Sequence, residues 1–185
     1  MLFLIILCAV PLLIVVILYN SLVGKKNQVN NAFASIDVLL KKRYDLIPNL
    51  VACVKNYLQH EKSTLTEITA LRAKAVSGNL SPNEKIDLDK KISKMVSGIM
   101  VAVENYPELK ASQNFLQLQA ALNEIEEQIS ASRRAYNSAV TDLNNAIEMF
   151  PTNILASMMN YKQRELFEIA ETERANVNVS DLFKQ

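Results

Sequence analysis

Residues able to do chemistry are few in this sequence, and their spacing does not bring them together. His60 and Glu61 are adjacent and suggest a metal site, but the chain contains one histidine, and one His with one Glu makes too few ligands for zinc. No arrangement of histidine with serine or cysteine points to a nucleophilic triad, and no glycine-rich phosphate loop occurs. Glu126 and Glu127 are neighbours on a helix and point apart, which makes them a poor acid–base pair. We therefore expect no enzymatic activity, no cofactor and no metal site.

The cysteines and the overall charge exclude further functions. Cys8 lies in an apolar run and Cys53 far along the chain, so we expect no disulfide between them. Cys53 stands between Ala52 and Val54, a context typical of a packing residue rather than a nucleophile. Twenty Lys and Arg residues nearly balance nineteen Asp and Glu residues, which gives no indication of a nucleic-acid partner.

Arg43 is the polar residue that packing explains least well. It falls on an apolar stripe between Leu40 and Ile47, where a hydrophobic side chain is expected. One interpretation is a polar site inside a helical bundle, which requires a paired carboxylate. The other is a side chain whose guanidinium reaches an acid on the rim of the bundle, and we prefer this more common arrangement.

Other polar residues repeat at helical spacing. Asp37, Lys41 and Asp45 follow one another at intervals of four, which is typical of a solvated outer helix face. Asn137 and Asn144 are one heptad apart beside the apolar stripe of a later segment. Asparagines in this position either fix the register of packed helices or simply face solvent, and the sequence leaves both alternatives open.

The element that must position these residues begins with an apolar run. Residues 1–18 contain no charged residue and no glycine, and residues 1–23 supply the about 20 residues that a helix needs to cross a bilayer. A cleaved signal requires basic residues before the run and a small-residue cleavage site after it, and neither is present. We therefore expect an uncleaved single-pass anchor in the cell (inner) membrane. Because Lys25 and Lys26 follow the run, the N-terminus is expected outside and the rest of the chain in the cytoplasm.

The remaining sequence predicts long helices with apolar residues at coiled-coil spacing. The expected ranges are 29–76, with a kink at Pro48, then 82–106, about 115–150 and 154–170. Ser81, Pro82 and Glu84 form a predicted helix start, Asn153 is expected to cap the last helix, and the final residues are expected to be extended.

These segments define the expected architecture. The fold class is all-α, with an N-terminal transmembrane helix that continues into an elongated antiparallel bundle of three to four helices. The expected organisation is an anchor at residues 1–23, a helical bundle at residues 24–175 and an extended C-terminal tail at residues 176–185.

Five segments of the sequence are distinctive: residues 36–51 (IDVLLKKRYDLIPNLV), 104–111, 114–119, 131–137 and 150–153. Together they resemble the LemA family of bacterial membrane proteins. The resemblance implies one N-terminal membrane helix followed by an antiparallel helical bundle. It supplies no activity, because the family has no established enzymatic role, and some relatives are tied to membrane organisation or magnetosome formation.

The LemA-like segment also suggests a place for contacts with other proteins. We expect a candidate interaction surface that consists of Asp37, Arg43, Asp45, Pro48 and Asn49. The predicted function is a membrane-anchored scaffold or adaptor without catalytic activity, which contacts the lipid bilayer through residues 1–23 and a protein partner that the sequence does not name. The alternative is a self-assembling homo-oligomer that organises or shapes the membrane.

Overall fold

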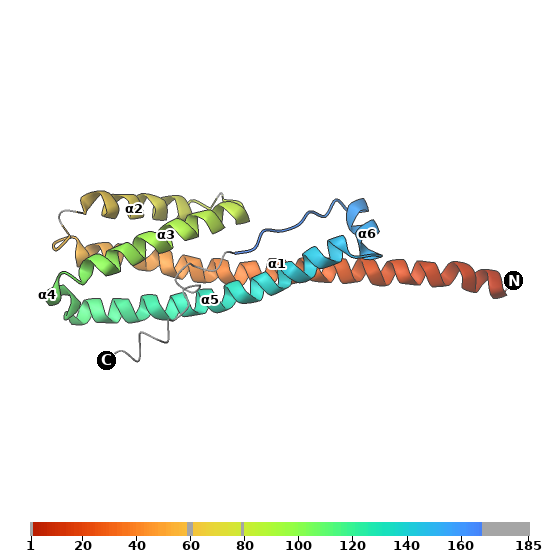
Figure 1. Cartoon of the computed structure of the whole chain (residues 1–185), viewed down its shortest axis with the longest axis horizontal. Coiled ribbons are helices and arrows are strands. Elements are labelled where there is room, and N and C mark those ends of the chain that lie inside the picture. The colour runs from red at the N-terminus through yellow and green to blue at the C-terminus, as the bar shows by residue number, and fades with distance from the viewer. Residues whose placement is uncertain (1, 59–60, 79, 168–185) are drawn as a thin grey trace, which may run out of the picture.

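The computed structural model describes residues 2–58, 61–78 and 80–167, which form helices and connecting segments without a β-strand (Figure 1). The helices are α1 (Leu2–Val54), α2 (Lys62–Val76), α3 (Pro82–Val103), α4 (Pro107–Lys110), α5 (Gln113–Glu148) and α6 (Thr152–Met158). The predicted all-α fold class is confirmed. The expected tail at residues 176–185 lies outside the described residues.

Helix α1 forms the axis of the molecule. It runs without interruption from Leu2 to Val54, as expected of a rod that continues from the apolar run into the bundle. Helix α5 lies antiparallel along it, α2 and α3 cover the half of α1 that is distant from the N-terminus, and the N-terminal part of α1 extends alone (Figure 1). The bundle is therefore built around a helix whose first third has no neighbour in the described part of the chain.

The core follows the apolar stripes of the two long helices. Side chains spaced by three, four or seven residues keep one helix face turned toward the neighbouring helix over many turns. The buried members on α1 are Leu22, Val29, Ile36, Leu40, Tyr44, Ile47, Leu50 and Val54, and those on α5 are Phe115, Leu118, Leu122, Ile129, Tyr136, Val140, Leu143 and Ala146.

The predicted continuous helix over residues 29–76 is wrong, because it is divided into α1 and α2. Helix α1 ends at Val54, and α2 begins at Lys62 and folds back onto the bundle. Leu58 in the connection and Ile68 on α2 are fully buried, and Leu65 on α2 is buried as well. The reversal places these side chains in the shared core instead of extending them into solvent, although no glycine or proline marks the turn.

Serine residues begin two of the helices. Ser81 Oγ accepts a hydrogen bond from the Glu84 amide at 3.3 Å, and the Glu84 carboxylate accepts one from the Ser81 amide at 2.8 Å. This capping box confirms the predicted start at Ser81 and Pro82. Ser112 caps α5 in the same manner by accepting from the Phe115 amide.

The last described helix is shorter than predicted and starts differently. Helix α6 covers Thr152–Met158 instead of 154–170, and Asn153 does not cap it. The helix ends because Asn160 adopts a left-handed conformation with φ of 52°. The Tyr161 amide then bonds to the Ala156 carbonyl at 2.9 Å, and the Asn160 amide bonds to the Ser157 carbonyl at 3.1 Å. These two bonds form a Schellman motif, which stops the helix without a glycine.

The chain after α6 is extended and returns along α5. Asn144 exchanges two hydrogen bonds with the backbone of Arg164, both at 2.9 Å. Asn137 does the same with Phe167, at 2.9 and 2.8 Å. Seven helical residues rise about 10.5 Å, and three extended residues cover about 10 Å. The heptad spacing of the asparagines therefore matches an extended segment, and their side chains act as its hydrogen-bonding partners.

Candidate functional site

A cluster of four charged side chains lies at the centre of the bundle. Arg43 on α1, Asp89 on α3, and Glu126 and Arg133 on α5 form this cluster, which we call the ionic cluster. Each helix brings its member inward because the residue occupies a position on the apolar stripe or next to it. Two guanidinium groups and two carboxylates balance in charge, so the cluster is neutral.

Arg43 is the most central member. Its side chain is 2% exposed. Its Nη1 donates to Glu126 Oε2 and to Ser93 Oγ, both at 2.8 Å, and its Nη2 donates to Asp89 Oδ1. Arg43 thus contacts two acids and one hydroxyl on two different helices, and these contacts cross-link α1 to α3 and α5.

Asp89 and Arg133 complete the ionic cluster. Asp89 is 1% exposed and accepts a second charged hydrogen bond, from Arg133 Nη2 to its Oδ2. Arg133 Nη1 also donates to Glu126 Oε1 at 3.4 Å. Each carboxylate is therefore shared by both arginines, an arrangement that offsets part of the desolvation of the buried charges, although the Nε atoms of Arg43 and Arg133 are buried without a hydrogen-bond partner.

The structure decides between the two interpretations of Arg43. The guanidinium does not reach to the rim, because the whole side chain is buried and one of its acids, Asp89, is buried with it. The preferred interpretation is wrong, and Arg43 belongs to a polar site inside the bundle. Sequence reasoning missed Asp89, although a signal was present: Asp89 lies three residues from both Ile86 and Ile92 on the apolar stripe of α3.

Burial changes the proton affinity of two neighbouring groups. It lowers the pKa of Arg43 from its ordinary value, and the adjacent Glu126 carboxylate counteracts part of this change. An arginine side chain nevertheless stays protonated in proteins. Burial raises the pKa of Tyr44, the next residue on α1, because a phenolate is poorly solvated there. The ionic cluster therefore supplies fixed charge and hydrogen bonds, and both of its carboxylates are engaged by arginine.

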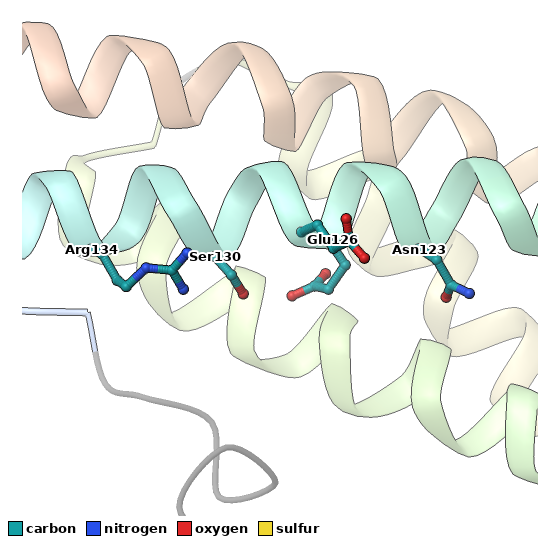
Figure 2. A pocket seen from close by; sticks show the side chains of 5 residues that line it. Asn123, Glu126, Ser130 and Arg134 are labelled. Carbon is teal, nitrogen blue, oxygen red and sulfur yellow. The ribbon is translucent and has the colours of Figure 1, made fainter.

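Glu126 connects the ionic cluster with the protein surface, because 45% of its side chain is exposed. It borders a hollow of about 710 Å³ that is also lined by Asn123, Glu127, Ser130 and Arg134. All five residues belong to α5, and Figure 2 shows the labelled side chains on one side of this helix, facing the space beside α3. The hollow is polar and carries both signs of charge.

Pro48 has a specific partner in the fold. A proline has no amide hydrogen, so it leaves the carbonyl four residues earlier, that of Tyr44, without its helical donor. Arg72 on α2 supplies the missing donor, with its Nε at 2.9 Å from the Tyr44 oxygen. The Arg72 guanidinium also lies 3.8 Å from Asp45. The proline thus creates an acceptor through which α2 is joined to α1.

The five residues expected to form an interaction surface do not share one surface. Arg43 is inside the bundle, whereas Pro48 and Asn49 are exposed. Asp37 pairs with Lys85 on α3 at 2.6 Å, and Asp45 approaches α2. The expected solvated ladder on α1 is therefore partly used for contacts between helices. Within the described part of the chain, no group of three or more His, Cys, Asp or Glu side chains could hold a metal ion.

The N-terminal part of α1 is apolar and exposed. Large hydrophobic side chains from Leu7 to Ile17 have about half or more of their surface accessible, and burial on this helix begins at Leu22. By length and composition α1 contains one candidate membrane span, near the N-terminus. An exposed apolar surface of this kind marks a site of contact with a membrane or another protein, and its length is that of a membrane span.

These features define the class of the protein: an elongated helical bundle with one candidate membrane span at its N-terminal end. The sequence model of the LemA family matches residues 32–180, and the chain belongs to this family. It is 29% identical to Protein LemA of Metamycoplasma hominis over 163 residues. These residues cover 88% of this chain and 74% of that protein.

Two magnetosome proteins are more distant relatives. Magnetosome protein MamQ 2 of Paramagnetospirillum magneticum is 22% identical over 90% of this chain and 71% of its own length. Magnetosome protein MamQ of Magnetospirillum gryphiswaldense is 21% identical over 80% of this chain and 64% of its own length.

Proposed function

We propose that the protein is a membrane-anchored helical scaffold or adaptor that acts through protein–protein contacts and has no catalytic activity. The observation that carries this proposal is the continuity of α1. One unbroken helix bears exposed apolar side chains at its N-terminal end and the buried stripe of the bundle from Val29 onward. Such a helix holds the bundle at a fixed distance and orientation relative to the membrane, because no flexible linker separates the two parts.

The charge pattern supports an orientation for the anchored protein. Lys25 and Lys26 follow the apolar run directly, and the positive-inside rule places such residues in the cytoplasm. We therefore propose that the N-terminus is outside, that the bundle is cytoplasmic, and that the membrane is the cell (inner) membrane.

The ionic cluster supports a structural rather than a chemical role for the bundle. Its two carboxylates accept hydrogen bonds from two arginines, and these bonds join α1, α3 and α5. Of the five candidate residues, Asp45, Pro48 and Asn49 are exposed and can contact a partner. We propose this α1 surface, Asp45 to Asn49, as the contact site.

A second candidate function is a self-assembling oligomer that organises the membrane. It is favoured by the relatives named magnetosome proteins, which match 80 to 90% of this chain. In such an oligomer, copies of the rod would stand side by side on one bilayer and contact one another through the same α1 surface.

Crosslinking of the full chain in its native membrane tests both functions. A lysine-reactive crosslinker followed by mass spectrometry should capture a specific protein in the first case and a regular series of homo-oligomers in the second. The Asn49→Arg variant should abolish the captured species, whereas Asn145→Arg, at an exposed position of α5, should not. If Asn49→Arg leaves the pattern unchanged while helicity is preserved, the α1 surface is not the contact site.

A further inference from the structure

We infer that the protein contacts the bilayer a second time, through the turn between α5 and α6 and the exposed face of α6. We call this region the apolar elbow, and its members are Met149, Phe150, Ile154 and Met158. The inference rests on the proposed anchoring of α1. The surface that fits the elbow is a lipid membrane, entered at the depth of the interface between headgroups and acyl chains.

The composition of the elbow is unusual for a surface exposed to water. Phe150 is 79% exposed and Met158 75% exposed, and Met149 and Ile154 are exposed beside them. No charged residue occurs between Glu148 and Lys162. A contiguous group of exposed large apolar side chains marks a surface for a protein or for a membrane.

The position of the elbow favours a membrane over a protein as the surface that it contacts. Leu22 on α1 is fully buried and packs against Ala146 on α5 and Ala156 on α6, whose small side chains let α6 approach α1 closely. Leu22 is also where the candidate span ends, since residues 1–23 supply the length that crosses a bilayer. Helix α6 thus lies beside α1 where the unaccompanied part of α1 begins (Figure 1). The exposed side of the elbow is consequently held at the level of the membrane surface.

Polar groups on the bundle side of the elbow match this placement. The Lys26 ammonium lies 5.5 Å from the centre of the Tyr161 ring, and Lys162 and Arg164 follow on the extended segment. Tyrosine and basic side chains are typical of the zone where lipid headgroups lie. The exposed residues that follow the elbow toward the bundle are basic at Lys162 and Arg164 and acidic at Glu165, and the aromatic and basic ones are of the kind found at a bilayer interface.

A second copy of the chain is the other way to cover the elbow, but the arrangement favours lipid. Any partner seated on Phe150 and Met158 would have to lie next to the span of α1, where the bilayer already occupies the space. The buried contact of Leu22 with Ala146 and Ala156 holds the elbow next to the span. A membrane covers both without requiring a further protein.

The experiment uses the absence of tryptophan from the chain, which allows single-tryptophan probes. Full-length Phe150→Trp is reconstituted into liposomes whose lipids carry bromine both on the upper part and near the end of the acyl chains, because bromine quenches tryptophan only at close range and the probes lie at different depths. Leu13→Trp reports on the candidate span. Val101→Trp, an exposed position on α3 at the opposite end of the bundle, reports on solvent. Met158→Trp gives a second probe of the elbow if Phe150→Trp does not fold.

The expected result is that Phe150→Trp emits at shorter wavelength than Val101→Trp and loses emission in brominated liposomes, whereas Val101→Trp does not. If Leu13→Trp is quenched but both elbow probes remain unquenched, the inference is overturned and the anchoring of α1 stands. A blue-shifted but unquenched Phe150→Trp also overturns it, because protein then covers the elbow. If Leu13→Trp is not quenched, the proposed anchoring fails and the inference fails with it.

Discussion

We predict that the Arg43→Met substitution in the ionic cluster strongly destabilises the protein. Methionine retains most of the length of the arginine side chain but removes its charge and its donors. Asp89, which is 1% exposed, keeps Arg133 as a partner, and Glu126 reaches solvent through its exposed part. The cluster then contains one positive and two negative groups, so the variant carries an uncompensated negative charge.

The expected loss in the free energy of unfolding follows from the charges that remain in the cluster. Removing one partner of a buried ion pair costs about 3–5 kcal/mol, and the remaining arginine places Arg43→Met near the lower end, at about 3 kcal/mol. For a chain of this size each kcal/mol lowers Tm by about 2–4 °C, so we expect a decrease of roughly 6–12 °C. Asp89→Leu should cost more, because it leaves two guanidinium groups with one partly exposed acid.

The double variant Arg43→Met with Asp89→Leu separates this explanation from a simple loss of packing. It leaves Arg133 and Glu126, which already form a hydrogen bond at 3.4 Å, as a neutral pair. Apolar replacement of a buried pair is often neutral or stabilising. We therefore expect the double variant to be more stable than either single variant, which is the sign of coupling between contacting residues.

Thermal unfolding of the full chain in detergent micelles, followed by circular dichroism, measures these effects. Arg134→Met is the matched control, because Arg134 lies one residue from Arg133 but is exposed, and a surface change of this kind costs within about 0.5 kcal/mol. The reasoning is refuted if Arg43→Met unfolds like Arg134→Met. It is also refuted if the losses of the two single variants simply add.

Three further predictions concern other contacts of the bundle. Burial raises the pKa of Tyr44, so its hydroxyl ionises in the unfolded chain before it does in the folded protein as the pH rises above about 10. The contribution of Tyr44 to stability should therefore be complete below that pH and decrease above it. In alkaline unfolding scans, Tyr44→Phe should show a smaller decrease. An equal fall in both proteins would contradict this. Asn137→Ala removes two hydrogen bonds to the extended segment and should accelerate hydrogen exchange at the Phe167 amide, and unchanged exchange would show that the segment is held by other contacts. Arg72→Ala leaves the Tyr44 carbonyl without a donor and should lower the free energy of unfolding by about 1–3 kcal/mol. The same substitution in a Pro48→Ala background should lower it less, because the alanine amide restores the helical donor. An equal loss in both backgrounds would refute the pairing.

Periodic features of the sequence predicted the fold well. The stripe of α5 recurs over many turns, and a helix with this pattern has one way to bury its apolar face. The capping box at Ser81 is local chemistry that needs no tertiary information, and it was confirmed. The rod formed by α1 follows from the lack of a strong helix breaker between the apolar run and the bundle.

Features that depend on distant residues were not predictable in the same way. The turn after Val54 contains neither glycine nor proline, and it forms because α2 gains a buried position by folding back. The end of α6 at Asn160 has a sequence signal, since asparagine tolerates the left-handed conformation, but the predicted helix ran through it. The role of Asn137 and Asn144 required knowledge that an extended segment lies along α5.

The candidate site shows the same division. The sequence identified Arg43 as a polar residue on an apolar stripe, and a buried arginine needs a carboxylate as its partner. It did not identify Asp89, because the pair is separated by 46 residues and joins two helices whose relative register only the fold determines. Of the remaining candidate residues, Asp37 and Asp45 proved to contact other helices, and Pro48 proved to create an acceptor for Arg72.

The central claim is that α1 holds the bundle to the bilayer as an uncleaved part of the working protein. The most direct measurement is alkaline carbonate extraction of native membranes, followed by mass spectrometry of the N-terminal peptide of the retained protein. The account predicts that the protein stays with the membrane and that residues 1–25 are recovered in it. A protein that is released by carbonate and begins after Tyr19 would contradict the account.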